Sequence, residues 1–159
     1  MVARKVAVAV GSNLGNRAAA IAFASTQLAA LLSNLQVSEV IETWPVGPGA
    51  EDQNLYLNAV AVGESDLPAR QILDALLAIE QAYGRERPHT NAARTLDLDL
   101  ILAGDQIVVE QGLEVPHPRF RERFFVLGPL AEVAPDLVDP VSGMRVGELL
   151  RELLRDETR

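Results

Sequence analysis

The sequence contains no cysteine, which excludes disulfide bonds, thiolate metal sites and cysteine nucleophiles. It has no hydrophobic run long enough to span a membrane, and its first residues lack the apolar stretch and cleavage site of a signal peptide. We therefore expect a cytoplasmic protein that does not bind membranes. With 48% hydrophobic and 23% charged residues over 159 positions, the composition is that of a globular protein, and we expect one domain over residues 1–159.

Lysine is almost absent, and positive charge is scarce. Of the 14 basic residues 13 are arginine, and the net charge at pH 7 is −8. An acidic surface repels the phosphate backbone of nucleic acids, so we expect no nucleic-acid partner. Six arginines nevertheless fall into two clusters: Arg85, Arg87 and Arg94, then Arg119, Arg121 and Arg123. The planar arginine fork suits phosphate groups. An arginine-rich composition explains the lack of lysine, but it does not explain the clustering.

The hydrophobic pattern predicts alternating strands and helices. Strands are expected over 5–10, 37–43, 56–62 and 95–102, with 106–110 as a hairpin partner of the last. Helices are expected over 17–32, from Pro68 to a left-handed cap at Gly84, and again over 121–127 and 146–154. This order predicts an α+β fold: a ferredoxin-like βαββαβ sandwich with an extra hairpin strand and C-terminal helices.

Two aspartates mark the strand over 95–102. Asp97 and Asp99 point to one face of such a strand, and the leucines between them point to the other. Two carboxylates on one face repel each other, and a hard divalent cation such as Mg²⁺ would offset that repulsion together with phosphate oxygens. The alternative is a half-buried strand with an acidic outer face, which alternation alone does not exclude. The flanking arginine clusters and His117 favour a metal–polyphosphate site.

Other polar motifs are weaker. Residues 11–15 follow a strand and precede a helix, but they lack the Gly-Lys-Ser/Thr ending of a phosphate loop. We interpret them as a structural turn, with Ser12, Asn13 or Asn16 capping the helix. His89 and His117 are far apart in sequence, and each is better explained by hydrogen bonding than by metal binding.

The aromatic side chains are few, at 4% of the residues, and most lie in or near irregular segments. These are Trp44, Phe120, Phe124 and Phe125, while Tyr56 lies in an expected strand, and they have two interpretations: ordinary packing, or stacking on a flat heterocycle. Asn58 lies in an otherwise apolar strand and needs a partner. Its amide would bond either the edge of a heterocycle or a neighbouring backbone group, and the sequence does not decide between them.

Taken together and in this order, the motifs resemble the 6-hydroxymethyl-7,8-dihydropterin pyrophosphokinase family (HPPK), which acts in folate biosynthesis. The matching stretches cover nearly the whole chain: 11–15 (GSNLG), 43–47 (TWPVG), 52–58 (DQNLYLN), 79–80, 84–85, 87–88, 94–99 (RTLDLD), 116–118 (PHP), 123–127 (RFFVL) and 129–135 (PLAEVAP). The combination of RTLDLD with the later PHP element is specific.

The resemblance implies a ferredoxin-like fold and a single pterin pyrophosphokinase domain. It implies a Mg²⁺-dependent diphosphotransferase, named 2-amino-4-hydroxy-6-hydroxymethyldihydropteridine diphosphokinase. This transferase moves pyrophosphate from ATP, its co-substrate, to the hydroxymethyl group of 6-hydroxymethyl-7,8-dihydropterin, and it releases AMP and the pterin diphosphate. Two Mg²⁺ ions and a monomeric state are expected from the same resemblance.

The resemblance also implies roles for single residues. Asp97 and Asp99 would hold the Mg²⁺ ions and form the catalytic set with Arg85 and Arg94. ATP would be bound by Arg87, His117 and Arg123. The pterin pocket would consist of Thr43, Val46, Tyr56, Asn58 and Phe125. The loop from Arg85 to Arg94 would close over the site. Asn91 and Pro118 depart from some relatives, which carry tryptophan and tyrosine there.

Two other functions remain as alternatives. A regulatory module with the same fold and no catalysis would leave Asp97 and Asp99 merely solvated, and its nucleotide binding would need no Mg²⁺. An ordinary kinase acting on another small heterocycle would release ADP instead of AMP.

Overall fold

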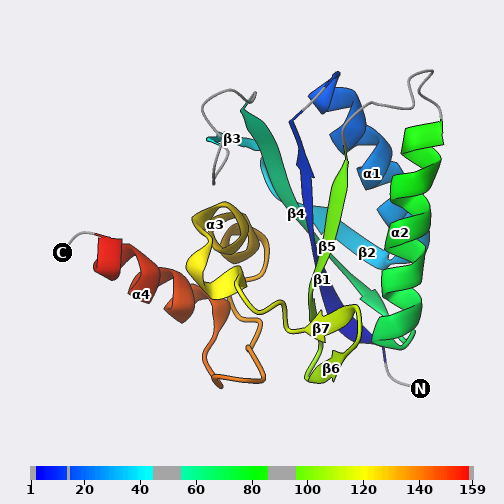
Figure 1. Cartoon of the computed structure of the whole chain (residues 1–159). Helices are drawn as coiled ribbons and strands as arrows, with labels where there is room; N and C mark the ends of the chain where they lie inside the picture. The colour runs from blue at the N-terminus through cyan, green and yellow to red at the C-terminus, as the bar shows by residue number, and fades with distance from the viewer. Residues whose placement is uncertain (1–2, 14, 45–54, 86–95, 158–159) are drawn as a thin grey trace.

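The computed structural model of the chain describes residues 3–13, 15–44, 55–85 and 96–157 (Figure 1). Its strands are β1 (Arg4–Ser12), β2 (Ser33–Val37), β3 (Ile41–Thr43), β4 (Tyr56–Ser65), β5 (Asp97–Ala103), β6 (Val108–Glu110) and β7 (Leu113–Val115). Its helices are α1 (Arg17–Leu31), α2 (Ala69–Arg85), the short 3₁₀ helix η2 (Phe120–Glu122), α3 (Phe124–Val133) and α4 (Val146–Glu157).

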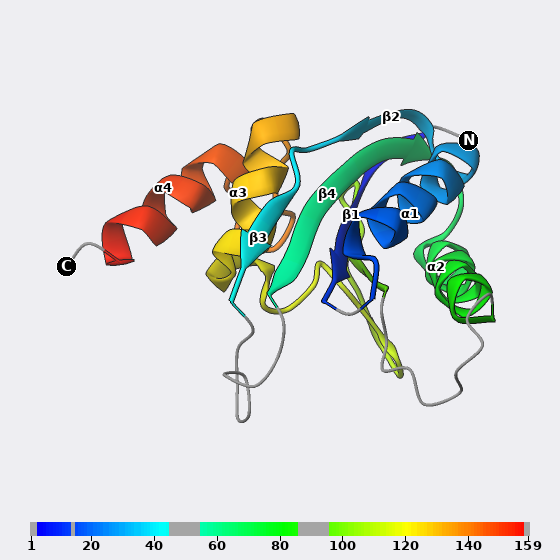
Figure 2. The same ribbon diagram turned by 90° about the horizontal axis from the view of Figure 1, so that it is seen from above.

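An antiparallel sheet forms the centre of the protein. Its strands lie in the order β2-β4-β1-β5, and β3 also pairs with β4. Helices α1 and α2 cover one face, and η2, α3 and α4 lie on the other (Figures 1 and 2). The expectation of a mixed fold with an antiparallel sheet and helices is confirmed. In the part of the chain that the structure describes, none of the helices is long and apolar enough to cross a membrane.

Each face of the sheet carries its own apolar core. Alternate residues of β1 point to opposite faces, so Val8 packs in a cluster with Leu28 of α1 and Leu76 of α2. Ala7 belongs to a second cluster that includes Phe120 of η2. All five side chains are completely buried. The sheet is therefore held from both sides, which fixes the direction of every side chain on its central strands.

Helix α1 begins as the sequence predicted. Asn16 is the N-cap, and its side chain accepts a hydrogen bond from the Ala19 N–H at 3.0 Å. Such a bond satisfies one of the free N–H groups at a helix start. The prediction of a structural cap between the first strand and this helix is confirmed for Asn16.

The strand expected over 37–43 is instead two short strands, β2 and β3, with an interruption at Ser38. The Ser38 N–H donates to the Val60 carbonyl at 2.9 Å, and the Ser38 hydroxyl accepts from the Val60 N–H at 2.9 Å. The side chain thus takes the place of a backbone acceptor, so the chain stays attached to β4 while its ladder is broken.

Two further expectations were wrong. Gly84 is not a left-handed cap, because α2 continues through it to Arg85 and Gly84 does not have a positive φ. The segment over 106–110 is not a hairpin partner of β5: β6 pairs with β7 in a separate two-stranded sheet. The turn of that hairpin contains Gly112 at φ 78°, a conformation that glycine adopts without strain.

Candidate active site

The register of the sheet brings polar side chains from β4 and β5 to one face, on either side of β1. Asp97 lies opposite Gly11, and Asp99 lies opposite Ala9. On the other side of β1, Gly11 lies opposite Asn58. Directly opposite residues of antiparallel strands share a face, so the two aspartates and Asn58 point to the same side. The residues between them on β1 are small, which leaves space above the strand.

The two faces of β5 differ as the alternation predicted. Leu98 and Leu100 are buried on the α1 and α2 side, whereas Asp97 is half-buried and Asp99 is exposed. The strand is also anchored between the two aspartates, because the Leu98 N–H donates to the Glu80 Oε2 of α2 at 2.7 Å. This bond ties the position of the acidic pair to helix α2.

A pocket of about 660 Å³ opens between this part of the sheet and the start of α3. It brings together seven of the predicted site residues: Thr43, Tyr56, Asn58, Asp97, Asp99, Arg123 and Phe125. The other lining residues are Ala9, Val10, Gly11, Trp44, Ala59, Arg119, Glu122, Phe124 and Val126. A volume of this size accommodates a small organic ligand.

Asn58 is oriented by a neighbouring side chain. Its Nδ2 donates to the Thr43 Oγ1 at 2.5 Å. Its Oδ1 lies toward the floor of the pocket, since a Cβ added at Gly11 would be 3.2 Å from it. Neither sequence interpretation named Thr43 as the partner. The arrangement presents an amide oxygen, which accepts hydrogen bonds, above a glycine that keeps the space open.

Tyr56 stays protonated at neutral pH. Burial raises the pKa of its phenol above the ordinary value, and the negative charge of Asp97 raises it further. The hydroxyl group is therefore a hydrogen-bond donor beside the acidic pair.

His117 lies next to the pocket and is not among the residues that line it. Its backbone N–H donates to the Ile101 carbonyl at 2.9 Å, and its Nδ1 accepts from the Arg119 N–H at 3.2 Å. Burial lowers the pKa of its imidazole below the ordinary value, although the Asp99 charge opposes that shift. The ring is thus neutral at pH 7 and carries its proton on Nε2.

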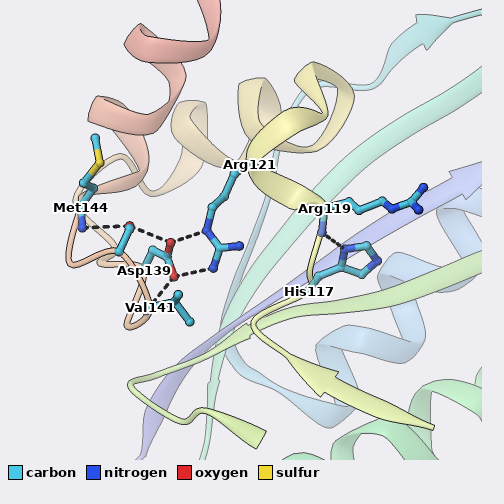
Figure 3. A network of polar contacts seen from close by, with 7 residues as sticks. His117, Arg119, Arg121, Asp139, Val141 and Met144 are labelled. Atoms are coloured by element: carbon cyan, nitrogen blue, oxygen red, sulfur yellow. Dashed lines mark hydrogen bonds and ion pairs between the residues drawn. The ribbon is translucent and has the colours of Figure 1, made fainter. Parts of the chain in front are cut away.

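The second arginine cluster divides between two tasks. Arg119 and Arg123 line the pocket. Arg121 instead binds the completely buried Asp139, through Nε at 2.5 Å and Nη2 at 2.9 Å. Figure 3 shows Arg121 reaching Asp139 while Arg119 extends in the other direction. The Val141 N–H and the Ser142 hydroxyl also donate to Asp139, so this ion pair fixes the loop before α4.

Some of the predicted site residues lie outside the described part of the chain. These are Val46, Arg87 and Arg94, together with the side chain of Arg85. The loop expected to close over the site, with His89 and Asn91, lies there as well. Their roles stay predictions from the resemblance.

The structure adds residues that sequence reasoning missed. Gly11 and Ala9 form the floor of the pocket, and Glu122 lines it beside Arg123. Gly11 was expected in a turn, but it belongs to β1. The signal that could have found it is the pairing of β1 with β5, which places a residue without a side chain opposite Asp97.

The acidic pair fits a hard divalent cation as a partial ligand set. Among the described residues there is no group of three or more His, Cys, Asp or Glu side chains that could hold a metal ion alone. Two carboxylates on one face, with Asp99 exposed, match the way Mg²⁺ is usually held, by one or two carboxylates plus phosphate oxygens and water.

Sequence comparison identifies relatives over most of the chain. A model of the family described as 7,8-dihydro-6-hydroxymethylpterin-pyrophosphokinase (HPPK) matches residues 7–135. The chain is 42% identical over 155 residues to the 2-amino-4-hydroxy-6-hydroxymethyldihydropteridine pyrophosphokinase of Pseudomonas aeruginosa, covering 92% of this chain and 90% of that protein. It is 39% identical over 150 residues to the protein of the same name from Synechocystis, covering 92% and 74% of the two chains.

A solved structure shares the fold. The crystal structure of an HPPK-DHPS in complex with substrates matches with a TM-score of 0.74 at 11% sequence identity. The match covers 98% of this chain and 44% of that one, so this chain spans less than half of the solved protein. At this identity the likeness concerns the fold alone.

Proposed function

The chain belongs to the 7,8-dihydro-6-hydroxymethylpterin-pyrophosphokinase family, and we propose that it transfers pyrophosphate from ATP to the hydroxymethyl group of 6-hydroxymethyl-7,8-dihydropterin. The products are AMP and the pterin diphosphate. The observation that carries the proposal is one pocket that holds the strand aspartates Asp97 and Asp99, a third carboxylate from Glu122, two arginines, several aromatic rings and the Asn58 amide. This combination suits a flat heterocycle joined to a phosphate-transfer centre.

The pterin is held by the part of the pocket formed by β3 and β4. The Asn58 Oδ1 faces the open floor at Gly11 and accepts hydrogen bonds from the amino and ring N–H groups of a pterin. Tyr56 and Phe125 line the same pocket and provide aromatic surfaces for the ring. We include Thr43 because it orients Asn58, and Val46 by resemblance to the family.

The triphosphate is bound at the other side of the pocket. Arg119 and Arg123 supply positive charge, and the start of α3 lines the same space. The neutral His117 donates from Nε2. Arg85, Arg87 and Arg94 complete this set by resemblance to the family.

Asp97 and Asp99 are the residues that would hold Mg²⁺, two ions by resemblance to the family. Metal ions held there would neutralise the phosphate charge that develops during transfer. The chain's own contribution is alignment: β5 holds the carboxylates, and the pocket holds the acceptor hydroxyl beside the phosphates. Exclusion of water matters because water competes with that hydroxyl for the pyrophosphate group. We assign no general base.

We also propose the ferredoxin-like description for the sheet and its two leading helices. The antiparallel order β2-β4-β1-β5, in which β2 and β3 together take the place of one strand, supports it. The cytoplasmic location, the monomeric state and the lack of nucleic-acid and membrane partners stay predictions.

The experiment that tests the proposed function is product identification. The purified protein is incubated with Mg²⁺, the dihydropterin and ATP labelled in its β-phosphate, and the products are separated by chromatography. We expect unlabelled AMP and labelled pterin diphosphate, only when pterin and Mg²⁺ are both present. Labelled ADP would mean transfer of a single phosphoryl group and would overturn the proposal. No turnover by the folded protein would favour a binding module.

A further inference from the structure

Trp44 is a large apolar side chain in an unusual place. It is 79% exposed, and it lines the pocket of the proposed active site. It follows directly after β3, next to Thr43, whose hydroxyl accepts a hydrogen bond from Asn58. An exposed tryptophan contributes nothing to the apolar core, so its position at the pocket needs another explanation.

A second exposed aromatic ring lines the same pocket from α3. Phe124 is 45% exposed, and its ring lies back over Gly128, where an added Cβ would be 3.1 Å from Phe124 Cζ. The ring is thus supported from behind by its own helix and keeps one side toward the pocket. Trp44 and Phe124 belong to segments 80 residues apart in sequence, and both bring apolar surface to the pocket.

We propose that the Trp44 indole packs against the pterin ring and is a specificity-determining contact for that substrate. This inference rests on the proposed function. Trp44 is adjacent in sequence to the pair Thr43 and Asn58, which presents the amide oxygen suited to a pterin edge. The charged residues suited to phosphate, Arg119 and Arg123, come from a different segment. A flat heterocycle can stack on an aromatic surface that is already exposed.

Substitution tests the contact through substrate affinity. Calorimetry with 6-hydroxymethyl-7,8-dihydropterin, in the presence of Mg²⁺ and α,β-methylene-ATP, should show a pterin Kd about fivefold higher for Trp44→Ala, and within about twofold of the original for Trp44→Phe. The pterin KM should rise with kcat nearly unchanged. Val109→Ala is the matched control, because Val109 is 77% exposed on β6 and does not line the pocket.

Fluorescence provides a direct readout, because Trp44 is the only tryptophan in the sequence. Acrylamide should quench the exposed indole efficiently in the free protein. Pterin binding should lower the bimolecular constant for quenching of the indole by acrylamide by at least about half. Deriving this constant from fluorescence lifetimes distinguishes shielding of the indole from energy transfer to the pterin. The α,β-methylene-ATP complex with Mg²⁺ alone should leave the constant unchanged.

The outcomes separate this inference from the proposed function. If the unsubstituted protein does not bind the dihydropterin, the proposed function fails. If it binds the dihydropterin, while Trp44→Ala keeps the same Kd and acrylamide still reaches the indole in the complex, only the role of Trp44 is overturned. A loss of nucleotide affinity with unchanged pterin affinity would also contradict the assignment to the pterin.

Discussion

The two faces of the β-sheet differ at the same end of the strands. On the face covered by α1 and α2, Val10 and Leu98 continue the apolar core and are 2% and 5% exposed. On the face toward α3, the neighbouring positions are Gly11, Asp97 and Asp99, and they line a pocket of about 660 Å³. Adjacent residues of the same strand therefore belong to the apolar core and to the pocket in turn, because successive side chains point to opposite faces of the sheet.

A rigid sheet can carry a charged site on one face when its other face is tightly packed. The face under α1 and α2 supplies the packing that holds β1 and β5 in place, and the opposite face can then leave space for a pocket lined by two neighbouring carboxylates. At this end of the strands, changes on the two faces should therefore have different consequences: loss of stability on the packed face, and loss of activity on the face with the pocket.

The largest effect is expected for the acidic pair. Asp97→Asn and Asp99→Asn should each lower kcat by about a thousandfold, because each removes negative charge that would hold the metal, and the metal would stabilise the developing phosphate charge. The melting temperature should stay the same or rise, since the substitution relieves repulsion on the strand. AMP formation and thermal unfolding measure the two quantities.

Asp74→Asn is the matched control for the acidic pair, because Asp74 is exposed on α2 and does not line the pocket. It should leave both activity and stability unchanged. Near-normal turnover in both Asp97→Asn and Asp99→Asn would contradict the catalytic role of this face.

The opposite face is tested by Leu76→Ala in α2. Leu76 is completely buried against the sheet, so the cavity should cost about 3 kcal/mol of unfolding free energy. The folded fraction should keep the pterin Kd within about twofold. Urea unfolding and calorimetry give the two values, and a specific loss of pterin binding at full stability would remove the distinction between the faces.

Disrupting the ion pair of Arg121 and Asp139 tests whether Arg121 has a structural role, in contrast to Arg119 and Arg123, which line the pocket. Burial alone would raise the pKa of Asp139, but hydrogen bonds from Arg121, Ser142 and the Val141 N–H lower it below its ordinary value. A carboxyl group with a lowered pKa in the folded state stabilises the protein above its unfolded pKa, and this stability is lost as pH falls through the folded pKa.

Asp139→Asn should therefore lower the free energy of unfolding by about 2 kcal/mol at neutral pH. Below about pH 4 the variant should lose less stability than the original protein, because it lacks the carboxyl group whose protonation destabilises the original fold. Pterin affinity should not change. Thermal melts from pH 7 to pH 2 measure the effect. An unchanged acid transition would show that Asp139 does not carry the pH dependence.

The smallest effect is expected at the pocket floor. In Gly11→Ala the new Cβ would lie 3.2 Å from the Asn58 Oδ1, so Asn58 must shift by a few tenths of an ångström. The pterin KM should rise about tenfold, equal to about 1.4 kcal/mol, with little change in stability. Gly84→Ala is the control: nothing lies within 4 Å of its added Cβ, and it should stabilise α2 by about 0.5–1 kcal/mol.

Much of the fold follows from local pattern. The alternation around Asp97 and Asp99 predicted one buried and one open face of β5, and the Asn16 cap predicted the start of α1. The break at Ser38 was not predictable in this way, because it depends on a side chain that bonds Val60 on another strand. Gly84 is a second example: its low helix propensity predicted the end of α2 there, but the helix continues through Gly84 to Arg85.

The site was predictable only in part. Residue chemistry and the family resemblance identified Asp97, Asp99 and Asn58, which the structure brings into one pocket. Gly11 was missed because its role depends on the pairing of β1 with β5, which places it opposite Asp97. The sequence of one strand does not reveal that pairing. Arg121 resembled its neighbours in sequence, and only the contact with the distant Asp139 sets it apart.

The most direct test of the central claim is a crystal structure of the protein with 6-hydroxymethyl-7,8-dihydropterin, α,β-methylene-ATP and Mg²⁺. The account predicts density for the pterin above Gly11 within hydrogen-bond distance of Asn58, and density for metal ions at Asp97 and Asp99. Ligands bound elsewhere on the protein, with the acidic pair contacting only water, would contradict it.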